Sequence, residues 1–330
     1  SVANKFLRSL TNTFEIDFHT LYIGTSICIA FFPYCGRDVE TLTKNADSAM
    51  YKAKQNGRNQ YQFYTSKMNH HALEELNMEM QLRQALENDE FVLHYQPKLQ
   101  LETGKLCGNE ALIRWNHSKD GLLYPAKFIP LLEQNGMISD VGSWVLKTAC
   151  QQHAKWQQEG LEVGKIAINL SGRQLLQKDF SLYVDKVLTE TGLDASSLEV
   201  ELTESLLIKN TKNTMKTLDA LRTMGVSIAI DDFGTGYSSF NYLKRFLIDT
   251  LKIDKSFIKN ITLKGPEAAI TSAIIHLAKD LGIHVVAEGV ETEQQMEFLY
   301  EQHIDEIQGY YVSPPVTSDA FTHIISAIAA

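Results

Sequence analysis

Two adjacent carboxylates, Asp231 and Asp232, follow a short run of apolar and small residues and precede a Gly-Thr-Gly turn. The run at residues 226–230 is typical of a buried strand, which places both acids at the end of that strand. Buried carboxylates are unfavourable unless a cation, an ion pair or a solvent-filled cleft compensates them. The doublet therefore indicates one of these three environments, and an exposed turn is the alternative if the doublet is considered alone.

A regular alternation of strands and helices positions this doublet. Strands are expected at residues 91–95, 109–115, 165–170, 198–202, 227–230, 250–253, 284–287 and 306–310, and amphipathic helical stretches lie between most of them. Eight strands with interleaved helices predict an α/β fold, a TIM-like (β/α)8 barrel. A doubly wound open sheet is the structural alternative, but no GxGxxG motif follows the first strand.

Oxygen-bearing or cationic side chains lie at the carboxyl end of nearly every predicted strand, the end that carries the chemistry in such barrels. They are Gln96, Glu110 (which opens the second strand's motif), Asn169, Glu201, Glu204, Asp231, Asp232, Lys252, Asp254, Glu288, Glu291 and Gln308. Oxygen ligands suit Mg²⁺ or Mn²⁺. Two ions about 3.5–4 Å apart would activate a water and neutralise a phosphate during phosphoryl transfer, with Lys252 stabilising negative charge or orienting the nucleophile.

Each of these residues also has an ordinary structural explanation when it is considered alone. Glu110 could be an exposed strand residue and Asn169 a turn cap, while Lys252 could form a weak rim ion pair with a neighbouring aspartate. Glu288 and Glu291 could begin a solvated helix, where acids favour the dipole. A separate structural explanation for a polar residue at nearly every strand end is less expected than one functional site that explains them all.

Composition excludes several classes of partner. The formal net charge of −9 argues against binding of long nucleic acid or an anionic membrane surface. The four cysteines and ten histidines form no metal-ligand spacing, so any metal should be held by oxygen. The longest apolar run, at residues 21–33, is too short to span a bilayer and no signal peptide is visible. A cytoplasmic location is expected. The Ser1 start suggests a fragment cut from a longer chain, and whether that parent is anchored to a membrane through an upstream region stays open.

The first part of the chain has a different pattern. A strand is expected at residues 21–32, a helix capped by Asp38 follows, and residues 61–64 suit an edge strand. These elements cannot bury a core alone. We predict three segments: a partial α+β domain at 1–64, a connecting helix at 65–89 and the barrel at 90–330.

The ordered strand-end motifs resemble the EAL phosphodiesterases, which hydrolyse cyclic di-GMP. The resemblance covers about residues 91–315 and rests on these segments: Tyr95-Gln96-Pro97-Lys98, Glu110-Ala111-Leu112-Ile113-Arg114-Trp115, Ile168-Asn169-Leu170-Ser171, Glu201-Leu202-Thr203-Glu204-Ser205, Asp231-Asp232-Phe233-Gly234-Thr235-Gly236, Leu251-Lys252-Ile253-Asp254, Ala287-Glu288-Gly289-Val290-Glu291 and Gln308-Gly309-Tyr310. Each motif alone is weak, but the ordered set is specific.

The resemblance implies a role for each matching residue. It makes Glu110, Asn169, Glu201 and Asp231 metal ligands, with Asp232 on a second ion of Mg²⁺ or Mn²⁺. It makes Lys252 and Glu288 the catalytic lysine and the glutamate that positions or deprotonates water, and Glu204 the brace of the loop after Asp232. Substrate or water contacts fall on Gln96, Arg114, Asp254, Glu291 and Gln308.

The implied product is linear pGpG, and a homodimer through the EAL domain is expected from the same resemblance. Two alternatives stay open: a receptor that binds cyclic di-GMP without cutting it, and a barrel enzyme for another phosphodiester. Residues 26–30 and 46–59 resemble the end of a GGDEF (diguanylate cyclase) domain, whose Gly-Gly-Asp/Glu-Glu-Phe turn is absent from this chain.

Overall fold

The computed structural model describes residues 1–10, 13–16, 19–21, 23–55, 57–208, 212–235, 248–261 and 265–328. These residues form two compact units, Ser1–Leu82 and Arg83–Ala330. Among the described residues, the helices are all too short or too polar to traverse a lipid bilayer. The predicted division into segments 1–64, 65–89 and 90–330 stays a prediction.

The N-terminal unit is small and built on two short strand pairs. Its elements are α1 (Val2–Leu10), β1 (Phe14–Ile16), β2 (His19–Leu21), β3 (Ile27–Ile29), α2 (Val39–Gln55), β4 (Tyr61–Phe63) and the first part of α3 (Ser66–Glu87). Helix α2 joins the parallel strands β3 and β4. The backbone N–H of Thr41 donates to Asp38 Oδ1 at 2.8 Å, which confirms the predicted helix cap.

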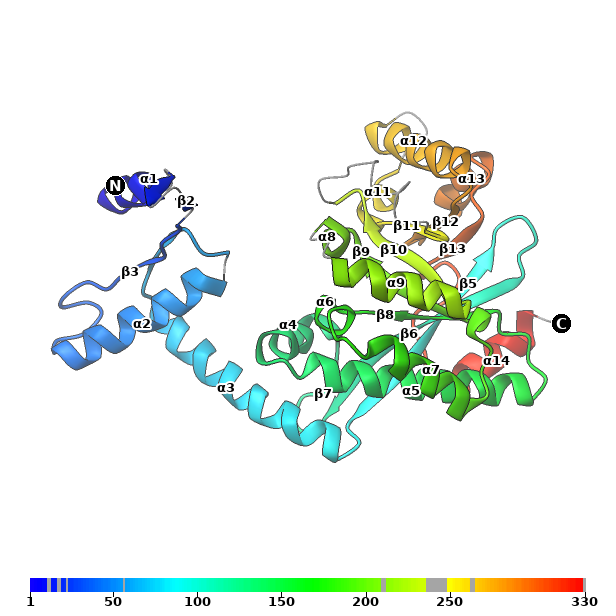
Figure 1. Ribbon diagram of the computed structural model, residues 1–330, viewed down its shortest axis with the longest axis horizontal. Coiled ribbons are helices and arrows are strands. Elements are labelled where there is room, and N and C mark those ends of the chain that lie inside the picture. Colours follow the sequence, from blue (N-terminus) through cyan, green and yellow to red (C-terminus); the bar gives the residue numbers. More distant parts are fainter. Residues whose placement is uncertain are drawn as a thin grey trace. The chain divides into compact units, whose positions relative to one another are not determined.

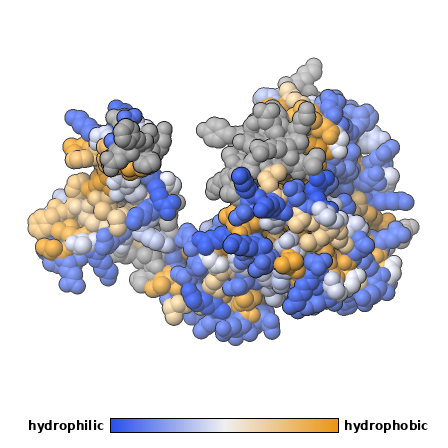
Figure 2. Space-filling view, in the orientation of Figure 1, coloured by the Kyte–Doolittle hydropathy of each residue, from blue (hydrophilic) through white to orange (hydrophobic). Residues whose placement is uncertain are grey.

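The prediction of one long strand at residues 21–32 is wrong. Strand β3 covers only Ile27–Ile29, because its partner β4 offers three residues for pairing. Apolar side chains remain exposed in this unit, among them Phe31, Phe32, Tyr34 and Val39, and hydrophobic colouring spreads over the part of the unit seen in Figure 2.

The larger unit is a closed barrel of eight strands with helices around it (Figure 1). Its strands are β5 (Phe91–Gln100), β6 (Leu106–His117), β8 (Lys165–Asn169), β9 (Leu198–Thr203), β10 (Ser227–Phe233), β11 (Thr250–Ile253), β12 (His284–Glu288) and β13 (Glu306–Gln308), and β7 (Gly121–Leu123) extends β6. The barrel order follows the chain, with β13 returning to β5. The predicted TIM-like barrel is thereby confirmed.

The helices of this unit follow the strands as the sequence pattern predicts. They are α4 (Pro125–Asn135), α5 (Ile138–Gln158), α6 (Gly172–Leu175), α7 (Phe180–Thr191), the 3₁₀ turn η1 (Ala195–Ser197), α8 (Glu204–Ile208), α9 (Lys212–Met224), α11 (Lys255–Lys259), α12 (Pro266–Asp280), α13 (Glu293–Glu301) and α14 (Ser318–Ile328). The apolar faces of the longer helices are buried; α5, for example, buries Val141, Leu146 and Trp156.

Strand β5 departs from a regular (β/α)8 barrel. It runs antiparallel to both of its neighbours, β6 and β13, whereas the other barrel strands pair in parallel. It also continues past Gln96 to Gln100, although the sequence pattern ends it at Tyr95. Pro97 normally marks a strand end because it lacks an N–H, but here it pairs within the β5–β6 ladder opposite Asn109.

Candidate active site

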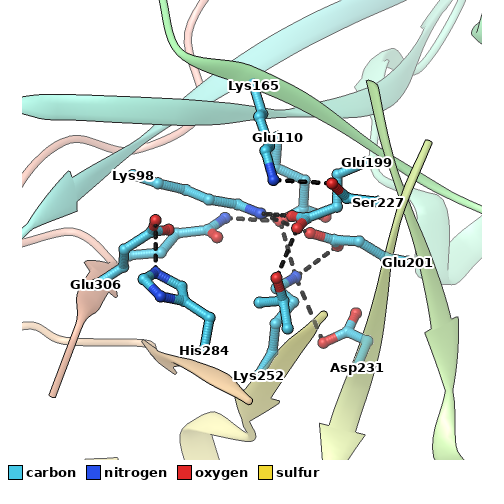
Figure 3. A network of polar contacts seen from close by, with 12 residues as sticks. Lys98, Glu110, Lys165, Glu199, Glu201, Ser227, Asp231, Lys252, His284 and Glu306 are labelled. Carbon is cyan, nitrogen blue, oxygen red and sulfur yellow. Dashed lines mark hydrogen bonds and ion pairs between the residues drawn. The ribbon is translucent and has the colours of Figure 1, made fainter. Parts of the chain in front are cut away.

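A fully buried ammonium group lies at the centre of the strand-end residues. Lys252 Nζ on β11 is 2.5 Å from Glu201 Oε2, 2.6 Å from Glu288 Oε1, 3.3 Å from Glu110 Oε2 and 3.4 Å from Asp231 Oδ1. The structure thus brings into one cluster five residues that are separated by as many as 178 positions in the sequence. Figure 3 shows four of them, Glu110, Glu201, Asp231 and Lys252.

Sheet register explains why these side chains meet. In parallel strands, side chains alternate between the two faces and the carboxyl ends share one edge. Glu201 on β9 pairs with Asn169 on β8 and with Ala229 on β10, so Asp231 lies two residues further along the same face. The antiparallel β5 brings Gln96 opposite Glu110 on β6, so Gln96 reaches the site from the interior of its strand.

Two amide side chains hold the Glu110 carboxylate, and a third supports one of them. Asn169 Nδ2 donates to Glu110 Oε1 at 2.6 Å, and Gln308 Nε2 donates to Glu110 Oε2 at 2.6 Å. Gln308 also donates to Gln96 Oε1 at 3.0 Å, and Gln96 donates to the carbonyl of Ser313. This chain of hydrogen bonds fixes the orientation of Glu110.

The end of β10 is bent at the aspartate doublet. Asp232 has a φ of +54°, which is strained for a residue other than glycine, and its N–H donates to Asp231 Oδ1 at 2.8 Å. The N–H of Gly234 donates to Glu204 Oε2 at 3.1 Å, so Glu204 holds the turn after the doublet. The predicted Gly236–Ser239 part of this loop lies outside the described residues.

Burial and mutual repulsion change the protonation of the acids. Burial raises the pKa of Glu288 to about 8, and the carboxylates of Asp231 and Glu110 add to this effect against the attraction of Lys252. The pKa values of Glu110 and Asp231 are raised first by burial and then by neighbouring acids, although Lys252 opposes the change. For Lys252, burial alone would lower the pKa, but the surrounding carboxylates outweigh it and raise the pKa well above its ordinary value.

The donor set fits hard divalent cations. Ligand atoms of Asp231, Asp232 and Glu288 lie within 4.8 Å of one another. Burial, and after it the neighbouring acids, raise the pKa values of Glu110, Asp231 and Glu288 against the attraction of Lys252. Carboxylate and amide oxygens are the preferred ligands of Mg²⁺ and Mn²⁺. The cluster can therefore hold such a cation.

A cleft of about 1210 Å³ opens onto the cluster. Its walls include Gln96, Glu110, Asn169, Asp231, Asp232, Glu288, Glu291 and Gln308. A cavity of this size can bury a ligand of drug size or larger. The polar cluster forms one wall, and apolar residues of α4, α5 and α6, such as Ile129, Val141 and Leu175, form another.

Five predicted residues do not line the cleft. Two of them, Glu201 and Lys252, belong to the buried cluster, and the other three are Arg114, Asp254 and Glu204. Arg114 is buried, donates to the carbonyl of Ile113 and packs 5.0 Å from the centre of the Tyr124 ring. Asp254 caps α11 through the N–H of Ser256, and Glu204 braces the turn at Gly234. Glu291 is exposed on the wall itself. The roles assigned to all predicted site residues stay predictions.

Two buried residues received no role from the sequence pattern. Lys98 Nζ lies 2.8 Å from Glu201 Oε1 and 2.9 Å from Glu199 Oε1. The spacing along the strands could have identified both residues, because Lys98 is two residues from Gln96 and Glu199 is two residues from Glu201. Residues two apart on a strand share a face.

Comparison with known proteins gives concordant matches. Residues 79–315 match the model of the EAL domain, and residues 1–60 match that of the diguanylate cyclase GGDEF domain. The bifunctional diguanylate cyclase/cyclic di-GMP phosphodiesterase MucR of Pseudomonas aeruginosa is 42% identical over 97% of this chain and 47% of its own length. The cyclic di-GMP phosphodiesterase PdeR of Escherichia coli is 37% identical over 97% of this chain and 48% of its own length.

Solved structures resemble the barrel as well. The structure of the PaMucR phosphodiesterase in complex with c-di-GMP is 42% identical, covers 74% of this chain and 99% of that chain, and superposes with a TM-score of 0.72. The EAL enzyme Bd1971, bound to cAMP and cyclic di-GMP, is 31% identical, covers 88% of this chain and 77% of that chain, and has a TM-score of 0.74. The chain spans less than half the length of the curated relatives MucR and PdeR.

Proposed function

Because this chain belongs to the EAL domain family and carries part of a GGDEF domain at its N-terminus, we propose that it is a phosphodiesterase that hydrolyses cyclic di-GMP. One observation carries the proposal: strand-end oxygens converge around the buried Lys252 at the wall of a large cleft. MucR and PdeR, named above, are cyclic di-GMP phosphodiesterases.

The metal ligands in this proposal come from four neighbouring strands of the barrel, β6, β8, β9 and β10. Glu110, Asn169, Glu201 and Asp231 hold one ion of Mg²⁺ or Mn²⁺, and Asp232 holds a second. Bound divalent ions of this kind neutralise charge on a phosphate and lower the pKa of water. The amide contacts to Glu110 and the Lys252 contact to Glu201 preorganise the ligands.

The chain's own residues supply the remaining parts of the reaction. Glu288 orients the attacking water and accepts its proton, a role that suits an acid whose pKa is raised to about 8. The Lys252 ammonium stabilises negative charge on the phosphate. Water opens one phosphodiester bond of cyclic di-GMP, and the product is linear pGpG.

The remaining predicted residues bind substrate or hold the site in place. Gln96, Glu291 and Gln308 contact substrate or water at the cleft wall. Arg114 and Asp254 complete the predicted substrate contacts, and Glu204 keeps the turn after Asp232 in position.

The decisive experiment is incubation of this chain with cyclic di-GMP and Mg²⁺ or Mn²⁺, with products separated by chromatography. We expect metal-dependent pGpG that disappears in EDTA. Glu110→Ala should lower kcat at least 100-fold, because loss of a direct ligand should exceed the roughly 10- to 100-fold effect of losing a ligand's supporting partner. Glu102→Ala, an exposed acid in the β5–β6 hairpin, is the matched control and should keep full turnover.

Two outcomes would contradict the proposal. Saturable binding of cyclic di-GMP by the metal-loaded chain without any product would identify a receptor. Cleavage of another phosphodiester in preference to cyclic di-GMP would support the proposed reaction type but show that the proposed substrate is wrong.

A further inference from the structure

A second buried lysine lies inside the barrel beside the proposed metal ligands (Figure 3). Lys98 Nζ contacts Glu201 Oε1 at 2.8 Å and Glu199 Oε1 at 2.9 Å, and its side chain is only 3% exposed. Lys252 contacts the other oxygen of Glu201. Both oxygens of this carboxylate are therefore held by ammonium groups.

Lys98 reaches Glu201 across the interior of the barrel. It lies on β5, and Glu201 lies on β9, with β6 and β8 between them in the sheet order. On β5, Gln96 and Lys98 are two residues apart and share the inward face. The antiparallel direction of β5 therefore brings the amide toward Glu110 and the ammonium toward Glu201.

Glu199 anchors the lysine from the same strand as Glu201. Its second carboxylate oxygen accepts a hydrogen bond from Thr250 Oγ1 at 2.8 Å. Thr250, Glu199 and Lys98 thus form a connected chain that ends on Glu201. Barrels of this kind usually fill the same space with apolar side chains, and a buried ion pair is often no more stable than an apolar replacement. Stability alone is a weak reason for these charges.

We propose that Lys98 is a positioning residue that fixes the Glu201 carboxylate for metal binding, an inference that rests on the proposed function. Supporting partners of metal-ligating carboxylates orient the ligand, and their loss typically lowers metal affinity or activity about 10- to 100-fold. Lys98 acts through Glu201 and does not touch the substrate.

Removal of Lys98 has two opposing effects that one variant cannot separate. Loss of a nearby positive charge favours cation binding, whereas loss of the contact frees the Glu201 side chain. The double variant Lys98→Met/Glu199→Leu removes one charge of each sign, so that the net charge inside the barrel is unchanged. It also leaves neither an ammonium nor Glu199 unpaired, which favours folding.

The test is a titration of the EDTA-treated full chain with Mn²⁺ in the absence of substrate, followed by electron paramagnetic resonance of free Mn²⁺. We expect the double variant to bind Mn²⁺ about 10- to 100-fold more weakly than the original chain. With saturating Mn²⁺, its KM for cyclic di-GMP should be unchanged and its kcat lower. Lys165→Met is the control, because Lys165 is an exposed lysine at the start of β8 that donates to the Ser227 hydroxyl at 2.8 Å. This variant should bind Mn²⁺ normally.

The single variant Lys98→Met provides a second comparison, and thermal unfolding of each EDTA-treated variant verifies the fold. If the double variant is folded and binds Mn²⁺ as tightly as an active original chain, the proposed role of Lys98 is wrong. The proposed function would not be affected by that result. If the original chain neither binds Mn²⁺ nor cleaves cyclic di-GMP, the proposed function and this inference both fail.

Discussion

The four carboxylates around Lys252 illustrate how the chemistry depends on single residues. Burial of the ammonium is unfavourable by itself, and the attraction of Glu110, Glu201, Asp231 and Glu288 reverses that effect on its pKa. Glu201 differs from its neighbours, because Lys252 and Lys98 overcome the effect of burial and lower its pKa to about 2. One carboxylate is thus kept ionised among others whose pKa values are raised.

Buried His153 on α5 leads to a prediction at the same scale. Burial lowers its pKa to about 4, whereas the ordinary value in an unfolded chain is about 6.5. The folded state therefore favours the neutral ring, and stability present above pH 6.5 is lost as the pH falls toward 4. Between pH 7 and pH 5 we expect a loss of about 2 kcal/mol in the free energy of unfolding, measured by urea denaturation.

Two variants isolate this effect. His153→Gln should remove most of the pH-dependent loss, even if its stability at pH 7 is lower. His276→Gln, at an exposed histidine on α12, should retain the loss seen in the original chain. An equal pH dependence in all three proteins would mean that His153 does not remain neutral.

At the scale of elements, the junction of β10 with its following turn sets the position of the aspartate doublet. The positive φ of Asp232 and the Glu204 contact to Gly234 bend the strand end. A side chain at Gly234 would meet the Phe257 ring at 2.6 Å, and this glycine also has a φ of +98°. The turn is therefore constrained from both sides.

Glu204→Ala should release this turn and misplace Asp232. We expect a kcat roughly 10- to 100-fold lower, since displacement of a catalytic group by about 1 Å has effects of that size. Glu204→Gln keeps an oxygen acceptor for the Gly234 N–H and should retain more turnover than the alanine variant. Equal turnover in both variants would show that the hydrogen bond does not hold the doublet.

At the scale of the whole molecule, the barrel contains every component of the described site. All strands of the closed sheet and all described residues lining the large cleft lie within Arg83–Ala330. A fragment of residues 66–330, which begins at α3, should therefore fold and hydrolyse cyclic di-GMP. Circular dichroism and the chromatographic assay test this. An unfolded or inactive fragment would show that the barrel needs the N-terminal unit.

A dimer through the EAL domain is the corresponding prediction about assembly. Size-exclusion chromatography with light scattering at micromolar concentration should give twice the chain mass of 37.2 kDa for the full chain. It should likewise give twice the fragment's own mass for residues 66–330. A monomer in both cases would contradict the prediction, and a dimer of the full chain alone would move the interface to the N-terminal unit.

The sequence by itself determined the barrel class and most of the candidate residues. Regular alternation of apolar strands and amphipathic helices predicts the fold, and strand β11 is found at the predicted bounds. Acids such as Glu201 and Asp231 were identifiable because parallel strands place their carboxyl ends on one edge. This inference needs only local pattern and strand direction.

Tertiary structure decided what the local pattern does not contain. The direction of β5 depends on its pairing with β6 and β13, and Pro97 gives a misleading local signal for its end. The same reversed strand brings Lys98 to Glu201, a contact between residues 103 positions apart. Spacing along the chain identifies which residues share a face of one strand. Closure of the barrel determines which side chains meet inside it, because that depends on the direction and register of every strand.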